Sequence, residues 1–409
     1  MVSYVTIHGS QNQTISIGYD TTSNFLLAQQ VAAGINAGIA AGTILTEPDN
    51  GVPPPTVPAS VTGAFVQAQN PFFIMPQGYS IDLVTKPSPA LVFGNGTSGQ
   101  TILSDVTTDL TFVASAGSGS VLAGGGDNRL FTSGTGNWSL YSGSGNDVVS
   151  ALNSVNATIG AGGGSNAILL GSGKDLIFSN GDDSISGGSG AETVDASGAS
   201  RDQVSGGDSQ LLFIGGAGGS TIYGGTGSDT YIGSAGFTGS QYIVGGSAGN
   251  NYLMAGDGPA TLVGGGNNDQ LMAYGISNQV LTAGSGNETL SALASSANDS
   301  LSAGSGTNLL IGGSGSDTFV GGAGTATVTS PFGNGVFEFI NGQAGGTELV
   351  TGIFQPSSIK IDLVGYSASE ADNALANQTS ANGSVTIGLT DGTKITFQDI
   401  NSLSKSNFS

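Results

Sequence analysis

Single apolar residues recur through the middle of the chain at nearly constant intervals, most often at every ninth position. Most of them follow a glycine-rich turn. One repeat of this length suffices for one short strand and one turn, so two such units close one coil of a parallel β-roll. The apolar residue then points into the coil and stacks on its equivalents in the neighbouring coils. The series begins with Leu130, Leu140, Val149, Ile159 and Ile168 and ends with Leu301, Leu310, Phe319 and Val328.

This recurrence accounts for the glycine content, which is 72 of 409 residues. We expect these glycines at the corners of the coils, because a tight corner needs a positive φ that costs other residues about 1 kcal/mol or more. Collagen is excluded because glycine lacks a period of three and there are 12 prolines. Disorder is excluded because 37% of the residues are hydrophobic. The sequence therefore predicts an all-β fold, a parallel β-roll or β-solenoid of glycine-rich, nonapeptide-like repeats.

The charge balance restricts the partners. The chain has 28 acidic and 7 basic residues, a net charge of −21, so it is not expected to bind nucleic acid. Cysteine is absent, which excludes disulfides and thiolate metal sites. The longest apolar stretch, Phe25–Leu45, contains polar residues and glycines, and we expect no membrane span. The first residues lack the features of a signal peptide, so export would need a route that does not read the N-terminus.

Segments on either side of the repeats are predicted to form a small α+β module at the N-terminus and a β-rich cap at the C-terminus. In the first, Leu27, Val31, Ile35 and Ile39 fall at helical spacing. The predicted division is an N-terminal hairpin plus amphipathic helix (1–46), a proline-rich connector (47–58), a short-strand module leading into the roll (59–90), the β-roll (91–329) and the C-terminal cap (330–409).

Two turns carry the pattern G-G-x-G-x-D-x-apolar most completely, one ending in Asp229-Thr-Tyr231 and the other in Asp317-Thr-Phe319. Over about residues 91–329 the chain resembles the nonapeptide repeats of RTX (repeats-in-toxin) proteins. The resemblance implies Ca²⁺ bound between successive turns by aspartates and backbone carbonyls, secretion through the type I apparatus, and an extracellular or cell-surface location. Val336–Ile340, Ile359–Leu363 and Ser406–Ser409 look like the post-repeat cap and the uncleaved type I secretion signal of such proteins.

Calcium sites of this type need acids two repeats apart, on the same side of the roll. Asp299 and Asp317 are separated by two repeats, and so are Asp183 and Asp202. Other equivalent positions hold Asn128, Trp138, Ala157 or Ser220, so we expect Ca²⁺ at part of the turns. The alternative is that Asn, Ser and backbone hydrogen bonds close the turns without metal. The candidate metal ligands are Asp147, Asp175, Asp183, Glu192, Asp202, Asp229, Asp269, Glu288, Asp299 and Asp317.

Catalytic residues are not evident. The single histidine, His8, lies in a predicted N-terminal strand, and the basic residues of the roll lie at unrelated coils. We therefore expect no enzyme, and a polysaccharide-active enzyme remains a minor alternative. The sequence favours a secreted structural protein that assembles with itself, head-to-tail or laterally, as a surface layer, filament or biofilm-matrix component.

Two binding functions remain open as alternatives. An adhesin or glycan-binding module would take a cell-surface or matrix polysaccharide as its partner, and Trp138 with Tyr141 is the conspicuous aromatic pair for it. An ice-binding roll would need a regular threonine ladder, but the motif Gly134-Thr-Gly-Asn137 occurs once.

Overall fold

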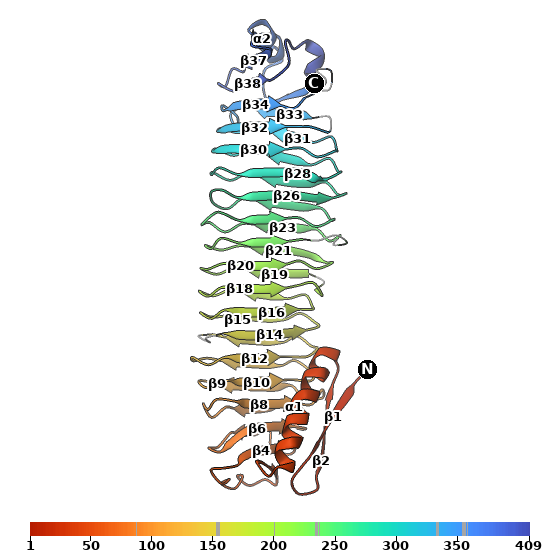
Figure 1. Cartoon of the computed structure of the whole chain (residues 1–409), viewed down its shortest axis with the longest axis vertical. Coiled ribbons are helices and arrows are strands. Elements are labelled where there is room, and N and C mark those ends of the chain that lie inside the picture. Colours follow the sequence, from red (N-terminus) through yellow and green to blue (C-terminus); the bar gives the residue numbers. More distant parts are fainter. Residues whose placement is uncertain are drawn as a thin grey trace. The chain divides into compact units, whose positions relative to one another are not determined.

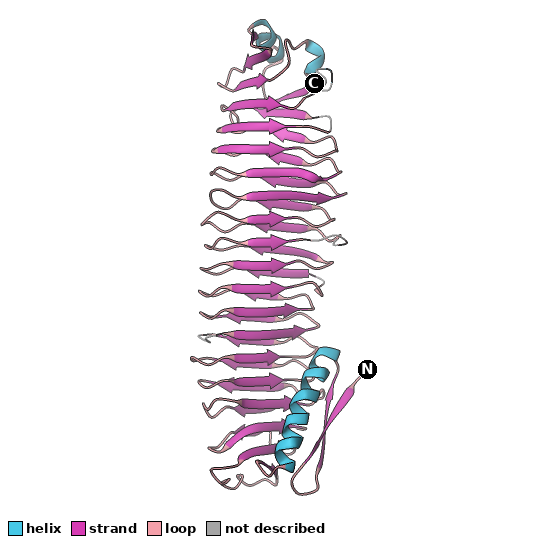
Figure 2. Ribbon diagram, in the orientation of Figure 1, coloured by secondary structure: helices cyan, strands magenta, loops and turns pink. Residues whose placement is uncertain are grey.

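The computed structural model describes residues 1–86, 88–152, 156–199, 201–233, 236, 238–332, 335–353, 357 and 359–409. These residues divide into two compact units, residues 1–209 and 210–409. Each unit is a parallel β-solenoid with two sheets (Figures 1 and 2). Apart from the N-terminal hairpin, β3 and the C-terminal cap, even-numbered strands form one sheet and odd-numbered strands form the other. This confirms the predicted all-β parallel β-solenoid.

Unit 1 begins with the antiparallel hairpin β1 (Ser3–His8) and β2 (Thr14–Tyr19), followed by helix α1 (Thr22–Ala40). The strands of its first sheet are β3 (Ile44–Pro48), β4 (Thr62–Gln67), β6 (Tyr79–Val84), β8 (Gln100–Ser104), β10 (Gly119–Leu122), β12 (Trp138–Tyr141), β14 (Ala157–Gly162), β16 (Asp175–Ser179) and β18 (Glu192–Asp195). Those of its second sheet are β5 (Phe72–Ile74), β7 (Ala90–Phe93), β9 (Leu110–Ala114), β11 (Arg129–Thr132), β13 (Val148–Ala151), β15 (Ala167–Leu170), β17 (Ser184–Ser186) and β19 (Arg201–Ser205).

Unit 2 repeats this arrangement and ends in a small cap. Its first sheet contains β20 (Leu211–Ile214), β22 (Thr230–Ile232), β24 (Tyr252–Met254), β26 (Gln270–Gly275), β28 (Thr289–Ser295), β30 (Thr307–Ile311), β32 (Thr325–Thr329) and β34 (Thr347–Thr351). Its second contains β21 (Gly219–Tyr223), β23 (Gln241–Val244), β25 (Ala260–Val263), β27 (Gln279–Thr282), β29 (Ser300–Ser302), β31 (Thr318–Val320), β33 (Val336–Ile340) and β35 (Lys360–Val364). The cap consists of α2 (Glu370–Ala376), β36 (Thr379–Ala381), β37 (Ser384–Gly388), β38 (Lys394–Phe397) and a 3₁₀ turn (Lys405–Asn407).

The core of each solenoid is a stack of the periodic apolar residues. In unit 1, Leu140, Ile159 and Ile177 are register partners on successive even-numbered strands, and none of them is accessible to solvent. In unit 2, Tyr231, Leu253 and Leu271 stack in the same way. Each coil therefore contributes one or two inward side chains per strand, and the hydrophobic core is continuous only because neighbouring coils align in register.

The N-terminal module of unit 1 covers the outer face of the first even-numbered strands. Ala28, Ala32 and Ile35 of α1 are buried against a cluster that includes Leu83 and Leu122 of the sheet. Small alanine side chains let the helix approach the sheet closely. This packing buries both faces of β4 and β6.

Parallel pairing begins before residue 91 and continues beyond residue 329, so it extends past both ends of the predicted roll. β3 already pairs in parallel with β4, and β4 with β6. The proline-rich connector therefore begins at the end of β3 and continues as the loop to β4 in the same sheet. In unit 2, β33 pairs in parallel with β31, and β35 with β33.

The predicted positive φ accounts for only part of the turn glycines. A positive φ is found at Gly143 and Gly162, but not at Gly188 and Gly207. What these turns share is close stacking on the next coil. A Cβ added to Gly207 would lie 1.6 Å from the carbonyl oxygen of Gly188. Glycine is needed there because the backbones of successive turns touch, which no side chain permits.

Candidate metal centre

The ten predicted ligands all lie two residues before an inward-pointing core residue. Side chains alternate along a strand, so each acid also points into the coil. All ten are at most 4% exposed. In unit 1, Asp147, Asp183 and Asp202 belong to the odd-numbered sheet, and Asp175 and Glu192 to the even-numbered sheet. In unit 2, Asp299 and Asp317 belong to the odd-numbered sheet, and Asp229, Asp269 and Glu288 to the even-numbered sheet.

Structure and sequence agree on which acids are neighbours. Asp175 and Glu192 are direct register partners on β16 and β18. The Asp183 backbone N–H donates to Asp202 Oδ1 at 3.1 Å, and the Asp299 backbone N–H donates to Asp317 Oδ1 at 2.9 Å. Acids predicted from a spacing of two repeats therefore lie on adjacent coils.

A ladder of side-chain oxygens runs along the odd-numbered sheet of unit 1. Each oxygen accepts the backbone N–H of the equivalent residue one coil earlier. Asn128 N–H donates to Asp147 Oδ1 at 2.7 Å, and Asp147 N–H donates to Asn166 Oδ1 at 2.9 Å. Asn166 N–H continues to Asp183 Oδ1 at 3.2 Å. One oxygen of each buried residue thus satisfies a backbone donor that the coil geometry would otherwise leave unpaired.

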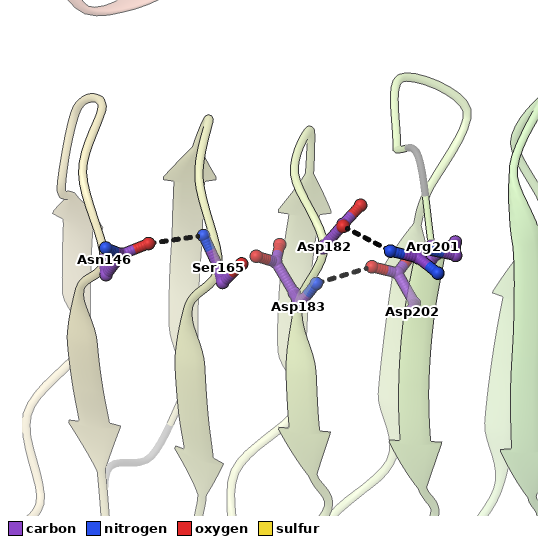
Figure 3. A network of polar contacts seen from close by, with 6 residues as sticks. All are labelled: Asn146, Ser165, Asp182, Asp183, Arg201 and Asp202. Carbon is purple, nitrogen blue, oxygen red and sulfur yellow. Dashed lines mark hydrogen bonds and ion pairs between the residues drawn. The ribbon is translucent and has the colours of Figure 1, made fainter.

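A second ladder lies one residue earlier in each turn, at the surface. Its direction is opposite, because Asn146 Oδ1 accepts from the Ser165 N–H of the next coil at 3.0 Å (Figure 3). Further along the same sheet, Arg201 lies 3.4 Å from Asp182. Both side chains are exposed, so this ion pair contributes little stability. The predicted closing of turns by Asn, Ser and backbone hydrogen bonds is therefore present.

The second carboxylate oxygens of the buried acids differ among themselves, because those of Asp183, Asp269 and Asp317 accept hydrogen bonds from described residues and others do not. Of the residues that the structure describes, none forms a hydrogen bond with Asp175 Oδ2 or Asp202 Oδ2. Burial raises the pKa of Asp147 to about 7 and that of Asp202 to about 6. A buried carboxylate that lacks a cation is costly, and its charged form is disfavoured. We call the stacked inward acids of each sheet its acid column. The acid columns therefore concentrate negative charge that a cation would stabilise.

Four stretches of the chain match the family model of the RTX calcium-binding nonapeptide repeat: residues 179–200, 212–237, 245–275 and 293–328. The chain carries the repeats of an RTX-type β-roll. No curated protein matches the chain. The RTX repeats contain Asp183, Glu192, Asp229, Asp269, Asp299 and Asp317, whereas Asp147, Asp175, Asp202 and Glu288 lie outside the matched stretches.

In unit 2 the RTX repeats form a ladder that includes an amide not among the predicted ligands. Asp229 N–H donates to Asn251 Oδ1 at 2.7 Å, and Asn251 N–H donates to Asp269 Oδ1 at 2.8 Å. Asn251 lies two residues before the core residue Leu253, as the predicted ligands lie before theirs. This position in the repeat could have identified it from the sequence. Burial raises the pKa of Asp229 to about 6.

Glu348 is an acid that the spacing missed. It is a register partner of Ala326 and lies two residues before the core residue Val350. Its Oε1 accepts the Gly322 N–H at 3.3 Å, and burial raises its pKa to about 7. The interval from Ala326 to Glu348 is longer than two ordinary repeats, and this hid the acid from a search based on the repeat spacing.

The donor set fits Ca²⁺. Ca²⁺ prefers six to eight hard oxygen ligands, which carboxylates and backbone carbonyls provide. Within the described part of the chain, no three His, Asp, Glu or Cys side chains converge on one point. A site here would therefore combine two acids from adjacent coils, such as Asp183 and Asp202, with turn carbonyls. When bound, Ca²⁺ supplies the positive charge that the columns lack. Neither helix in the described residues is long and apolar enough to cross a membrane.

Proposed function

We propose that this chain is an extracellular structural protein whose RTX β-solenoid is stabilised by Ca²⁺ and assembles laterally with copies of itself. RTX β-solenoids are typically structural, toxin-like or adhesin-like, and the repeats are typical of secreted proteins. The observation that carries self-assembly is the outer face of the even-numbered strands in unit 2, which is uncharged and carries one column of large apolar side chains.

This face consists of two columns of outward side chains. Ile214, Ile232, Met254 and Met272 are register partners on successive strands from β20 to β26. Each is only half-buried. The parallel column contains Leu212, Thr230, Tyr252, Gln270, Thr289 and Leu309. No outward residue of β20 to β30, all of which the structure describes, is charged.

A second copy of the chain is the occupant that fits this face. Contiguous apolar surface on a soluble protein generally marks an interface. The chain carries a net charge of −21, so two copies repel each other except where both present a neutral surface. Two such faces also have the same spacing of about 4.8 Å between strands, which makes them complementary in shape. In unit 1 the helix and hairpin cover this face only over the first strands, from β4 to β10.

Bound Ca²⁺ would favour assembly by changing the charge of the protein. Ca²⁺ held in the acid columns lowers the net negative charge and stiffens the coils, and both effects favour lateral contact. We therefore expect wild-type protein to form assemblies in Ca²⁺ and fewer in chelator.

Sedimentation velocity and negative-stain electron microscopy test this on the full chain. The double variant Ile232→Glu/Met254→Glu places two charges on the face and should remain monomeric in Ca²⁺. The matched control Ser247→Glu/Ser285→Glu adds the same charge at exposed turn positions and should assemble like the wild type. A wild-type protein that stays monomeric at high concentration with and without Ca²⁺ would refute assembly, and so would a double variant that assembles normally.

A further inference from the structure

Unit 1 contains a cleft of about 300 Å³ between the first turn of α1 and the outer face of the even-numbered strands. Three of its residues form one continuous column, because Tyr141 on β12 pairs with Gly160 on β14, and Gly160 pairs with Phe178 on β16. Asp195 of β18 extends the column by one strand. The volume is within the range of small-ligand sites.

Gly160 leaves room for the Tyr141 ring on the outer face of the sheet. A Cβ at this position would lie 2.4 Å from Cδ1 of Tyr141, so the tyrosine ring lies over the glycine. Phe178 stands two strands from Tyr141, which corresponds to about 9.6 Å along the sheet. Phe178 is 37% exposed and Tyr141 is half-buried, so both are open to a ligand from solvent.

Polar groups surround this aromatic floor. Ser23 from α1, and Asn180 and Ser197 from the turns, line the cleft and are exposed. Asp195 is held in place because its Oδ1 accepts the Ser197 backbone N–H at 3.0 Å. Among the described residues that line the cleft there is no Lys, Arg or His. A site with hydroxyl, amide and carboxylate groups but no cation repels anionic ligands and suits a neutral one that has many hydroxyl groups.

We propose that this cleft binds a neutral pyranose unit of an oligosaccharide. The C–H face of the sugar packs on the electron-rich faces of Tyr141 and Phe178. Its hydroxyl groups exchange hydrogen bonds with Ser23, Asn180 and Asp195. This site is independent of the assembly face in unit 2, and binding requires no second copy.

The same geometry corrects the aromatic pair considered from the sequence. Trp138 is 2% exposed and points into the coil, where its ring centroid lies 5.4 Å from that of Phe112. It cannot contact a ligand in the cleft. Tyr141, three residues later on the same strand, faces outward, and its partner in the cleft is Phe178.

Isothermal titration calorimetry on the full chain in Ca²⁺ tests the proposal, with neutral cello-, malto-, manno- and chito-tetraoses as probes and tetragalacturonate as the anionic comparison. We expect at least one neutral tetraose to bind with a dissociation constant below about 1 mM, and the anionic probe to bind at least tenfold more weakly. Phe178→Ala and Tyr141→Ala should each weaken binding at least tenfold, which corresponds to about 1.4 kcal/mol.

The control is Tyr223→Ala, which removes an exposed aromatic residue from β21, outside the cleft, and should leave affinity unchanged. Gly160→Ala should weaken binding because the new methyl group displaces the Tyr141 ring. Circular dichroism identifies any variant that fails to fold. The binding affinities are then compared among the variants that do fold. The proposal is overturned if no neutral tetraose binds, if tetragalacturonate binds best, or if both cleft variants and the control bind alike.

Discussion

The substitution Asp147→Asn isolates the cost of one buried charge in the acid columns. Asp147 is 1% exposed, and burial raises its pKa from 3.8 to about 7. Asparagine already occupies the equivalent positions one coil earlier and one coil later, at Asn128 and Asn166. The Asn128 amide donates to three carbonyl oxygens, those of Gly125, Gly126 and Ser142. The column therefore accepts an amide without losing its ladder.

The magnitude follows from the pKa. Each tenfold change in an ionisation constant is worth about 1.4 kcal/mol, so the increase from 3.8 to about 7 corresponds to about 4 kcal/mol as an upper bound. Because the pKa of Asp147 is higher in the folded state than in the unfolded state, this carboxyl lowers the stability of the fold as the pH rises. The cost is absent below pH 3.8, grows between pH 3.8 and about 7, and is complete above pH 7. In chelator at pH 8, Asp147→Asn should therefore stabilise the fold by up to about 4 kcal/mol, and at pH 4 by almost nothing.

Calcium reverses this expectation. A bound cation offsets the charge of Asp147, so in Ca²⁺ at pH 8 the variant should lose its advantage or become less stable than the wild type. Urea unfolding followed by far-ultraviolet circular dichroism measures all three conditions. Asp127→Asn is the control, because Asp127 is an exposed neighbour whose Oδ1 accepts the Asn146 N–H. A gain at pH 4 equal to that at pH 8, or no gain at pH 8 in chelator, would refute the reasoning.

Three further expectations concern the glycine stacking, the core and the metal. Gly162→Ala should destabilise unit 1 by about 2 kcal/mol or more, because its Cβ would lie 1.6 Å from the Gly143 carbonyl oxygen at a φ of 72°. Gly163→Ala has open space and should change the urea midpoint little, so equal effects would contradict the stacking argument. Leu253→Ala should cost about 2–5 kcal/mol, and a cost below about 1 kcal/mol would show that the stack tolerates a void. Chelation at pH 8 should lower the urea midpoint, and Ca²⁺ but not Mg²⁺ should restore it, because Mg²⁺ demands a tighter octahedral site.

The core of the roll was predictable because a single apolar position in each repeat carries it. An apolar residue at a fixed interval has to face inward on every coil, and parallel in-register pairing preserves the interval. The same logic located the acid pairs, since equal coil lengths bring Asp183 and Asp202 to adjacent strands. It failed at Glu348, where a longer coil breaks the interval.

The start of the solenoid was less visible for a different reason. Burial does not alternate regularly along β4 and β6, because the N-terminal hairpin and α1 cover their outer face. Proline-containing segments follow both strands in place of the glycine-rich turns that mark the roll. The sequence also predicted glycines at the corners of the coils, but not the physical reason why glycine is required there. At Gly207 the backbone conformation is ordinary, and the contact with Gly188 on another coil requires the glycine. A contact between residues on different coils leaves no local signal.

The acid columns contain both turns closed by hydrogen bonds and the candidate Ca²⁺ ligands, which the sequence presented as alternatives. One oxygen of each buried aspartate among the candidate ligands closes the backbone ladder, as a metal-free turn requires, whereas Glu192 and Glu288 accept N–H groups of their own turns. For Asp175 and Asp202 the other oxygen has no hydrogen bond from any described residue. The ladder bond persists when the carboxyl is protonated, because the oxygen that accepts it can remain an acceptor. Acid and Ca²⁺ are therefore two ways to remove the same cost, one by neutralising the carboxylate and the other by pairing it. It follows that the asparagines in the columns are positions where the turn closes at no electrostatic cost, and that the pattern of Asp and Asn along each sheet sets how strongly stability depends on the metal.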